Sequence, residues 1–83
     1  MSVDASFIRN RITELREFKQ VSESKMSFDL GKSKGYIQGI SRGDYLPKLE
    51  QFPEICEYLG VTPAEFFSER LSILIRSTNY YPN

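Results

Sequence analysis

Apolar and polar residues follow a helical period through the first 20 positions of the chain. Four apolar residues recur at intervals of three or four positions, with mostly charged or polar residues between them: Ile8, Ile12, Leu15 and Phe18. This spacing places the four side chains on one face of a helix. We therefore predict a helix over residues 6–19, with Asp4 or Ser6 as its N-cap.

Two shorter helices are predicted on either side of Gly31. Ser22 is a suitable N-cap for the first of them, which carries the apolar Met26 and Leu30 and stops at the glycine. The second is predicted over residues 33–43, with a serine as N-cap at its first position and a glycine at its end. Its inward-facing residues are Tyr36, Ile37 and Ile40.

A fourth helix follows a predicted loop at residues 44–47. It begins near Gln51 or Phe52, because Pro53 fits a helix only in its first turn, and it ends at Gly60. Its apolar face comprises Phe52, Ile55, Cys56 and Leu59.

The segment Thr62-Pro63-Ala64-Glu65 is a strong helix start, because it combines an N-cap threonine, a proline at the first position and a capping-box glutamate. Phe66 and Phe67 follow and are predicted to point into the core. Two patterns compete after them: Leu71, Leu74 and Ile75 fit a helical face, whereas Leu71, Ile73 and Ile75 alternate as in a strand. The helix is favoured, so the predicted fold class is all-α.

Length and composition limit the function. With 83 residues, 40% of them hydrophobic and 27% charged, the chain has room for one globular domain and does not have a disordered composition. No apolar run approaches the roughly 20 residues that span a bilayer, and no signal peptide is evident at the start. A single cysteine, Cys56, fits a reducing cytoplasm and is predicted to fill the core.

Catalytic and metal-binding patterns are not evident. The chain has no histidine, which excludes a Cys–His pair and a typical zinc site. The acidic residues do not suggest a catalytic dyad. We therefore expect neither an enzyme nor a bound cofactor, and no small-molecule substrate is evident.

Charge is distributed unevenly, although the formal net charge is zero. Residues 32–48 contain four basic residues and one acid, whereas residues 49–83 contain two basic residues and five acids. A basic segment of this kind is a weak indication of a polyanionic partner.

Residues 23–43 match the helix-turn-helix pattern of two short helices joined by a glycine turn. Ser27 must be small, because the helices cross closely there, and Gly31 must adopt a left-handed conformation. Four apolar residues lock the second helix against the first: Met26, Leu30, Ile37 and Ile40.

Residues 11–67 resemble the Cro/CI-type (xenobiotic-response-element) repressor family without evident gaps. The segments that carry the resemblance are Arg11 to Arg16, Asp29 to Ile37, Ile40 to Gly43, Leu46-Pro47, Ile55 to Thr62, and Glu65 to Phe67. The resemblance implies a five-helix, lambda-repressor-like DNA-binding domain in residues 1–70, followed by a short C-terminal extension in residues 71–83. It also implies a homodimer that binds a palindromic site in double-stranded DNA.

The same resemblance implies that the helix at 33–43 enters the major groove. The residues implied to face DNA from this helix are Ser33, Lys34, Gln38 and Arg42. Gln38 would pair with an adenine edge, and Lys34 would reach guanine or a phosphate. Further phosphate contacts are implied at the start of the second helix and at two lysines: Ser22, Glu23, Lys32 and Lys48.

Some positions depart from the family pattern. Glu23 stands where glutamine is usual, and Lys32 stands where an apolar residue is usual after the turn. The family usually pairs a buried arginine of the first helix with a glutamate near the end of the third. Arg16 is present here, but the position of its partner is occupied by Ser41. Two glycines, Gly35 and Gly39, lie on one side of the helix at 33–43 that is implied to enter the major groove. They either permit close approach of the helix backbone to DNA or mean that this face of the helix reads few bases. We predict a sequence-specific transcriptional regulator, with a protein-interaction module that has lost DNA binding as the alternative.

Several residues are assigned from their position alone. Arg9, Lys19 and Lys25 are predicted to be solvated, and Phe28 either packs on a neighbouring element or marks a partner surface. A homodimer contact is predicted in the C-terminal third, where apolar residues exceed what one small core needs. The residues of this predicted contact are Leu71, Leu74, Ile75, Tyr80 and Tyr81.

Overall fold

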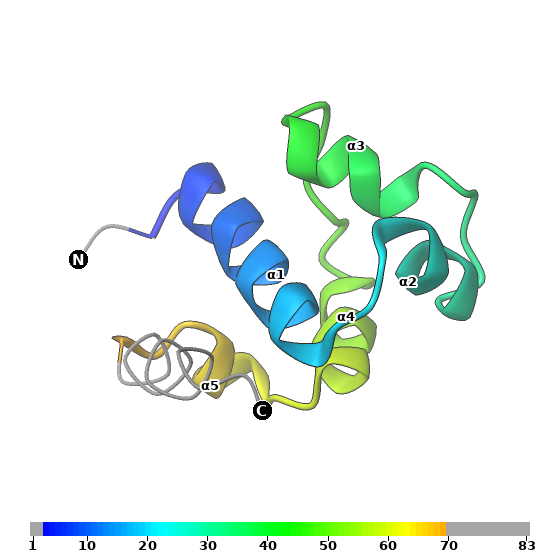
Figure 1. Ribbon diagram of the computed structural model, residues 1–83. Helices are drawn as coiled ribbons and strands as arrows, with labels where there is room; N and C mark the ends of the chain where they lie inside the picture. Colours follow the sequence, from blue (N-terminus) through cyan, green and yellow to red (C-terminus); the bar gives the residue numbers. More distant parts are fainter. Residues whose placement is uncertain (1–2, 70–83) are drawn as a thin grey trace.

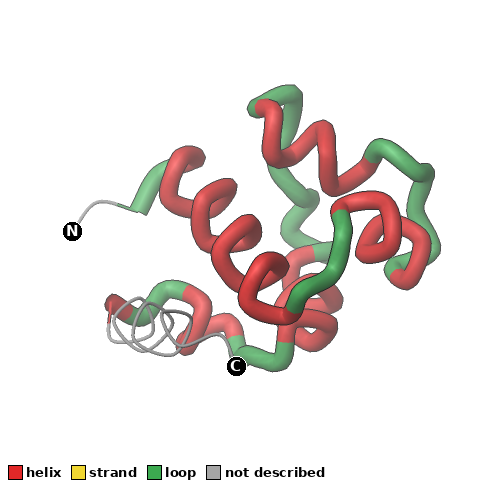
Figure 2. Tube along the Cα trace, viewed as in Figure 1, coloured by secondary structure: helices red, strands yellow, loops and turns green. Residues whose placement is uncertain are grey.

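The computed structural model describes residues 3–69. Its helices, in chain order, are α1 (Ala5–Lys19), α2 (Glu23–Asp29), α3 (Tyr36–Arg42), α4 (Phe52–Leu59) and α5 (Pro63–Phe66) (Figure 1). Loops and turns join them, and residues 3–69 contain no strand (Figure 2). The prediction of an all-α domain is therefore confirmed for the part of the chain that the structure describes.

Side-chain caps fix the starts of three helices where the sequence predicts them. The Asp4 carboxylate accepts a hydrogen bond from the Phe7 N–H at 3.0 Å and starts α1. The Ser22 hydroxyl accepts from the Lys25 N–H at 3.0 Å and starts α2. Before α5, Thr62 and its capping-box glutamate exchange reciprocal bonds of 3.1 and 2.9 Å. Each cap satisfies a backbone donor that would otherwise have no partner inside its helix.

One core lies between the helices. Figure 1 shows α2 and α3 on one side of α1 and α5 on the other, and α4 packs against both α1 and α5. The buried apolar residues are Ile12, Leu15, Met26, Ile37, Ile40, Ile55, Cys56, Leu59 and Phe66. Phe67 is only partly buried, and Phe18, predicted on the inward face of α1, is 43% exposed. Among residues 3–69, no helix combines the length and apolar character that crossing a bilayer requires.

A buried cation joins the first helix to the last. Arg11 is 2% exposed, and its guanidinium donates to the carbonyl oxygens of Phe66 and, at 3.2 Å, of Ser68. It also pairs with Glu14 at 3.3 Å and lies over the ring of Phe7. A buried charge is tolerated only with such partners. Arg11 therefore holds the short α5 helix against α1.

Candidate nucleic-acid interface

A single serine fixes the crossing of α2 and α3. The Ser27 side chain is fully buried, and its hydroxyl donates to the Glu23 carbonyl at 2.8 Å. The same oxygen accepts from the Ile37 N–H at 2.9 Å. The sequence predicts that this residue must be small. The structure adds that its hydroxyl satisfies a backbone donor in the first turn of α3.

The turn between the two helices follows from Gly31. This glycine has φ of +73°, which is the left-handed conformation predicted for it. The Lys32 N–H then bonds back to the Ser27 carbonyl at 2.9 Å and closes the end of α2. The chain runs on through residues 32–35 before α3 begins.

The predicted start of the third helix at Ser33 is wrong. Regular helix begins at Tyr36, and Ser33 and Lys34 lie in the turn before it, where the Ser33 carbonyl accepts from the Tyr36 N–H at 3.1 Å. Gly35 occupies the N-cap position, and glycine is a poor helix former. Because Ser27 supplies the hydroxyl oxygen to the first turn, α3 does not need a serine of its own as cap.

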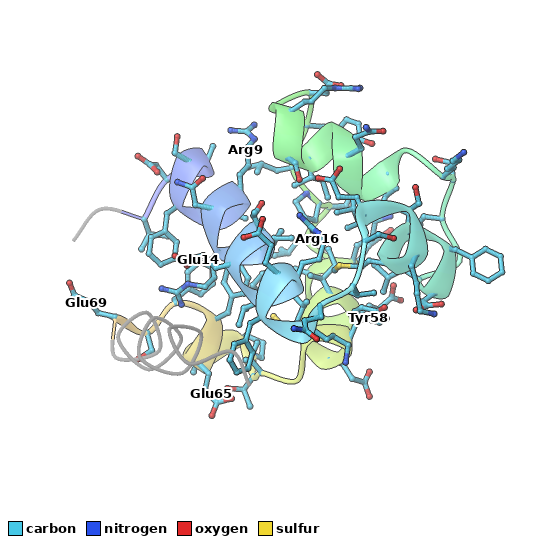
Figure 3. All side chains as sticks on the ribbon, in the orientation of Figure 1. Arg9, Glu14, Arg16, Tyr58, Glu65 and Glu69 are labelled. Atoms are coloured by element: carbon cyan, nitrogen blue, oxygen red, sulfur yellow. The ribbon has the colours of Figure 1, made fainter. Side chains whose placement is uncertain are left out.

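The end of α3 is held from α1. Arg9 projects from α1 toward α3 (Figure 3), and its guanidinium donates to the Ile40 carbonyl at 3.1 Å and to the Gly43 carbonyl at 3.4 Å. These carbonyls lie at the end of α3, where intrahelical partners run out. Arg9 is therefore partly buried and bonded, and the prediction of a solvated side chain is wrong.

Two of the predicted base-reading residues lie on the helix itself. Gln38 and Arg42 are four residues apart on α3, and both side chains are exposed. Residues four apart share one face of a helix. Ser33 and Lys34 are exposed as well, in the turn before α3. The structure thus brings these four predicted contact residues to α3 and to the turn that leads into it.

Arg42 already has a partner. Its guanidinium bonds the Asp44 carboxylate at 2.7 and 3.2 Å, and both side chains are largely exposed. This hydrogen bond, reinforced by the charge of Asp44, raises the pKa of Arg42. The negative charge of Glu23 adds a smaller contribution that raises this pKa further. A phosphate that contacts Arg42 must therefore compete with Asp44.

The residues predicted to contact phosphates do not all gather in one place, and Glu23, half-buried in the first turn of α2, is not among those that line the groove described next. Ser22, Lys32 and Lys34 line one open groove beside α2, where the Lys32 ammonium lies 5.7 Å from the centre of the Tyr36 ring. Lys48 lies in the loop between α3 and α4 and is not among the residues that line this groove. Its N–H donates to the Gln51 side chain at 3.2 Å, which fixes the backbone there and leaves the ammonium exposed.

One face of α3 is occupied by a tyrosine that the sequence analysis does not single out. A Cβ at Gly39 would meet the Tyr45 hydroxyl and lie 2.7 Å from its Cε2 atom. The Tyr45 hydroxyl donates to the Tyr36 carbonyl at 2.9 Å, and the two rings stack with centres 6.1 Å apart. Gly39 therefore makes room for Tyr45, a packing role that the sequence analysis does not foresee, and what this face means for DNA contact stays a prediction. Gly35 differs, because a Cβ there would meet no atom within 4 Å.

The single cysteine lies away from α3. Cys56 is buried in α4, and burial raises the pKa of its thiol, in agreement with the predicted role in the core. Within residues 3–69, no group of three or more cysteine, aspartate or glutamate side chains is arranged to hold a metal ion. The exposed side chains of α3 and of the turn before it offer hydrogen bonds and positive charge.

Comparison of the chain with models of known protein families, with curated proteins and with solved structures finds no match. Support for a function therefore comes from the side chains themselves and from their arrangement on α2, α3 and the adjoining loops.

Proposed function

We propose that the chain is a sequence-specific DNA-binding transcriptional regulator that inserts α3 into the major groove. We further propose that it has the lambda-repressor-like fold and binds a palindromic operator as a homodimer. One observation carries the proposal: α3 is fixed from within by Ser27 and from its end by Arg9, while Gln38 and Arg42 extend outward. A helix held in this way is suited to the major groove, whose width admits an α-helix.

The exposed residues would divide the work of recognition. Gln38 lies in the middle of α3 and has the amide needed for a bidentate pair with adenine. Lys34 and Ser33, one turn earlier, would contact bases or phosphates at the groove edge, and Lys48 would add charge alone. Arg42 would exchange Asp44 for DNA, at small cost because an exposed ion pair contributes only about 0–1 kcal/mol.

The ion pair provides a test, because its two partners should act on DNA binding with opposite sign. Removal of the cation in Arg42→Ala should weaken binding to a mixed-sequence duplex. Removal of the competing carboxylate in Asp44→Ala should strengthen it. If the ion pair served only to stabilise the fold, Arg42→Ala and Asp44→Ala would lower the stability of the protein equally. Thermal unfolding of both variants is therefore the control.

Fluorescence anisotropy over a salt series measures the effect. The wild-type log–log slope should be about −2 to −4 per subunit, and Arg42→Ala should make it shallower by about 1. Binding that is insensitive to salt would contradict the proposal, as would equal losses of affinity in the two variants.

A further inference from the structure

We propose that DNA flanking the operator half-site runs over a second surface, a basic groove beside α2, where the ring of Phe28 packs against the sugar of the backbone. This inference rests on the proposed function and extends it beyond α3. The groove is open, with a volume of about 570 Å³. Its lining residues are Ser22, Ser24, Lys25, Phe28, Lys32 and Lys34.

The charge of the groove fits a phosphate backbone. Three of its lining residues are lysines, two are serines, and none of them is an acid. Lys34 is exposed in the turn before α3, whereas Lys25 shares its ammonium with Asp29 at 3.2 Å. The Lys25 side chain is largely exposed, so its ion pair is weak and the ammonium can turn to a phosphate at little cost. Neutralisation of phosphates by such lysines releases counterions and favours binding.

Phe28 adds an apolar contact inside this basic surface. Its side chain is 78% exposed, so it does not pack on a neighbouring element, and the other sequence interpretation, a partner surface, remains. A ligand that fits must offer apolar and anionic groups side by side. The deoxyribose and phosphate of a DNA strand do so, and the ring is the only non-polar side chain among the lining residues.

The position of the groove favours DNA over an acidic protein segment. Lys34 belongs both to the groove and to the surface proposed for the operator, and Ser22 and Lys32 of the groove are among the phosphate contacts expected from the sequence. A strand that leaves the major groove beside Lys34 would therefore meet Lys25 and Phe28, which line the same groove.

The test compares variants that distinguish charge from apolar contact. The probe is a mixed-sequence duplex of 30 base pairs (about three helical turns), and affinity is measured over a salt series. Phe28→Ala should weaken binding about threefold to tenfold with an unchanged salt slope, because a lost apolar contact releases no counterion. Lys25→Ala should weaken binding and reduce the slope by about 1. Phe18→Ala and Lys19→Ala on α1, outside the groove, are matched controls that should bind like the wild type.

The possible failures separate the two proposals. If Arg42→Ala weakens binding but Phe28→Ala does not, the groove does not contact DNA and the proposed function stands. If the wild type does not bind the duplex at all, both proposals fail. Polyglutamate serves as a counter-probe: binding to it that depends on Phe28, with DNA binding unchanged, would assign the groove to an acidic protein partner.

Discussion

Two serines near α3 differ in what their hydroxyl groups bond. Ser27 is fully buried and bonds the Glu23 carbonyl and the Ile37 N–H, so it serves both helices of the α2–α3 unit. The Ser41 hydroxyl is also buried but has no hydrogen-bond partner among the described residues. Residue type alone does not distinguish these serines, because the difference lies in which backbone groups the fold brings to them.

Alanine substitution should separate the two serines. Ser27→Ala leaves the Ile37 N–H without its acceptor and should lower the free energy of unfolding by about 1–3 kcal/mol. Ser41→Ala removes an unsatisfied hydroxyl and should change it by no more than about 0.5 kcal/mol. Urea denaturation measures both values. Equal losses in the two variants would contradict the assigned role of Ser27.

A tyrosine and an aspartate join α4 to the end of α2. The Tyr58 hydroxyl donates to the Asp29 carboxylate at 2.7 Å, and this bond holds the pKa of Asp29 below its usual value of 3.8. Burial, together with the bond to Asp29, raises the pKa of Tyr58 to about 12. Both shifts favour the pair in which aspartate is ionised and tyrosine is protonated.

The pH dependence follows from these directions. Asp29 stabilises the fold above the pKa of an unfolded aspartate, and this contribution is lost as pH falls through its depressed folded value. For Tyr58 the contribution is present below pH 10 and is lost as pH rises toward 12. Tyr58→Phe should raise the pKa of Asp29 toward 3.8, measured by carboxyl-carbon NMR titration. An unchanged Asp29 titration would show that the hydrogen bond does not form in solution.

At the scale of the elements, local signals predict helix ends well. Ser22 caps the N–H three residues later, and Thr62 and Glu65 form their box within four residues, so the sequence contains the complete signal. The glycines at 43 and 60 end their helices with positive φ in the same local way. These features account for the correct bounds of α2, α4 and the start of α5.

Contacts between residues distant in sequence account for the ends of α3 and the position of α5, which the local pattern of apolar and polar residues does not predict. The start of α3 depends on Ser27, which lies ten residues before Ile37. The end of α3 depends on Arg9, 31 residues from its acceptor Ile40, and α5 depends on Arg11, 55 residues from Phe66. An arginine in an amphipathic helix usually faces solvent, so the residues around Arg9 and Arg11 give no local sign of these bonds.

The glycines of α3 differ in what a side chain would meet. Gly39→Ala gains about 1 kcal/mol of helix propensity but displaces Tyr45 and its hydrogen bond to Tyr36. In a Tyr45→Ala background the displacement costs nothing, so Gly39→Ala should be about 0.5–1.5 kcal/mol more favourable there. A double-mutant cycle by thermal unfolding measures this coupling.

Gly35→Ala is the matched control for that cycle. A Cβ at Gly35 meets open space, and its φ of −94° is accessible to alanine. Its effect should therefore be the same whether or not Tyr45 is present. Coupling of Tyr45 to Gly35 as strong as its coupling to Gly39 would contradict the packing described.

At the scale of the molecule, the sequence predicts which candidate contact residues are exposed but not which side chains they pair with. Gln38 and Lys34 are exposed as expected, Gln38 because of its polarity and its place in the helical period, and Lys34 because of its charge, although it lies in the turn before α3. The ion pair of Arg42 with Asp44 arises from the turn after Gly43, and the basic groove arises from the fold of residues 22–34. The net charge of the chain sums over its acidic and basic surfaces, so a value of zero does not reveal the basic groove.

Self-association concerns the whole chain. The dimer contact predicted at residues 71–83 lies outside the described residues. A homodimer is still expected, because a single recognition helix rarely gives useful affinity and two half-sites about one helical turn apart do. Sedimentation of the full chain at tens of micromolar without DNA should show a dimer, and Leu74→Asp should shift it to monomer. A monomer at every concentration would remove the dimer from the proposal.

Selection of bound fragments from a random duplex pool, with the wild type and Gln38→Ala in parallel, tests the central claim most directly. The wild type should recover a palindrome with half-sites about one helical turn apart. Gln38→Ala should relax one base position in each half-site, with a discrimination loss of about 1–3 kcal/mol and stability within about 0.5 kcal/mol of the wild type. Recovery of no motif, or of the same motif with unchanged discrimination by Gln38→Ala, would contradict DNA reading by α3.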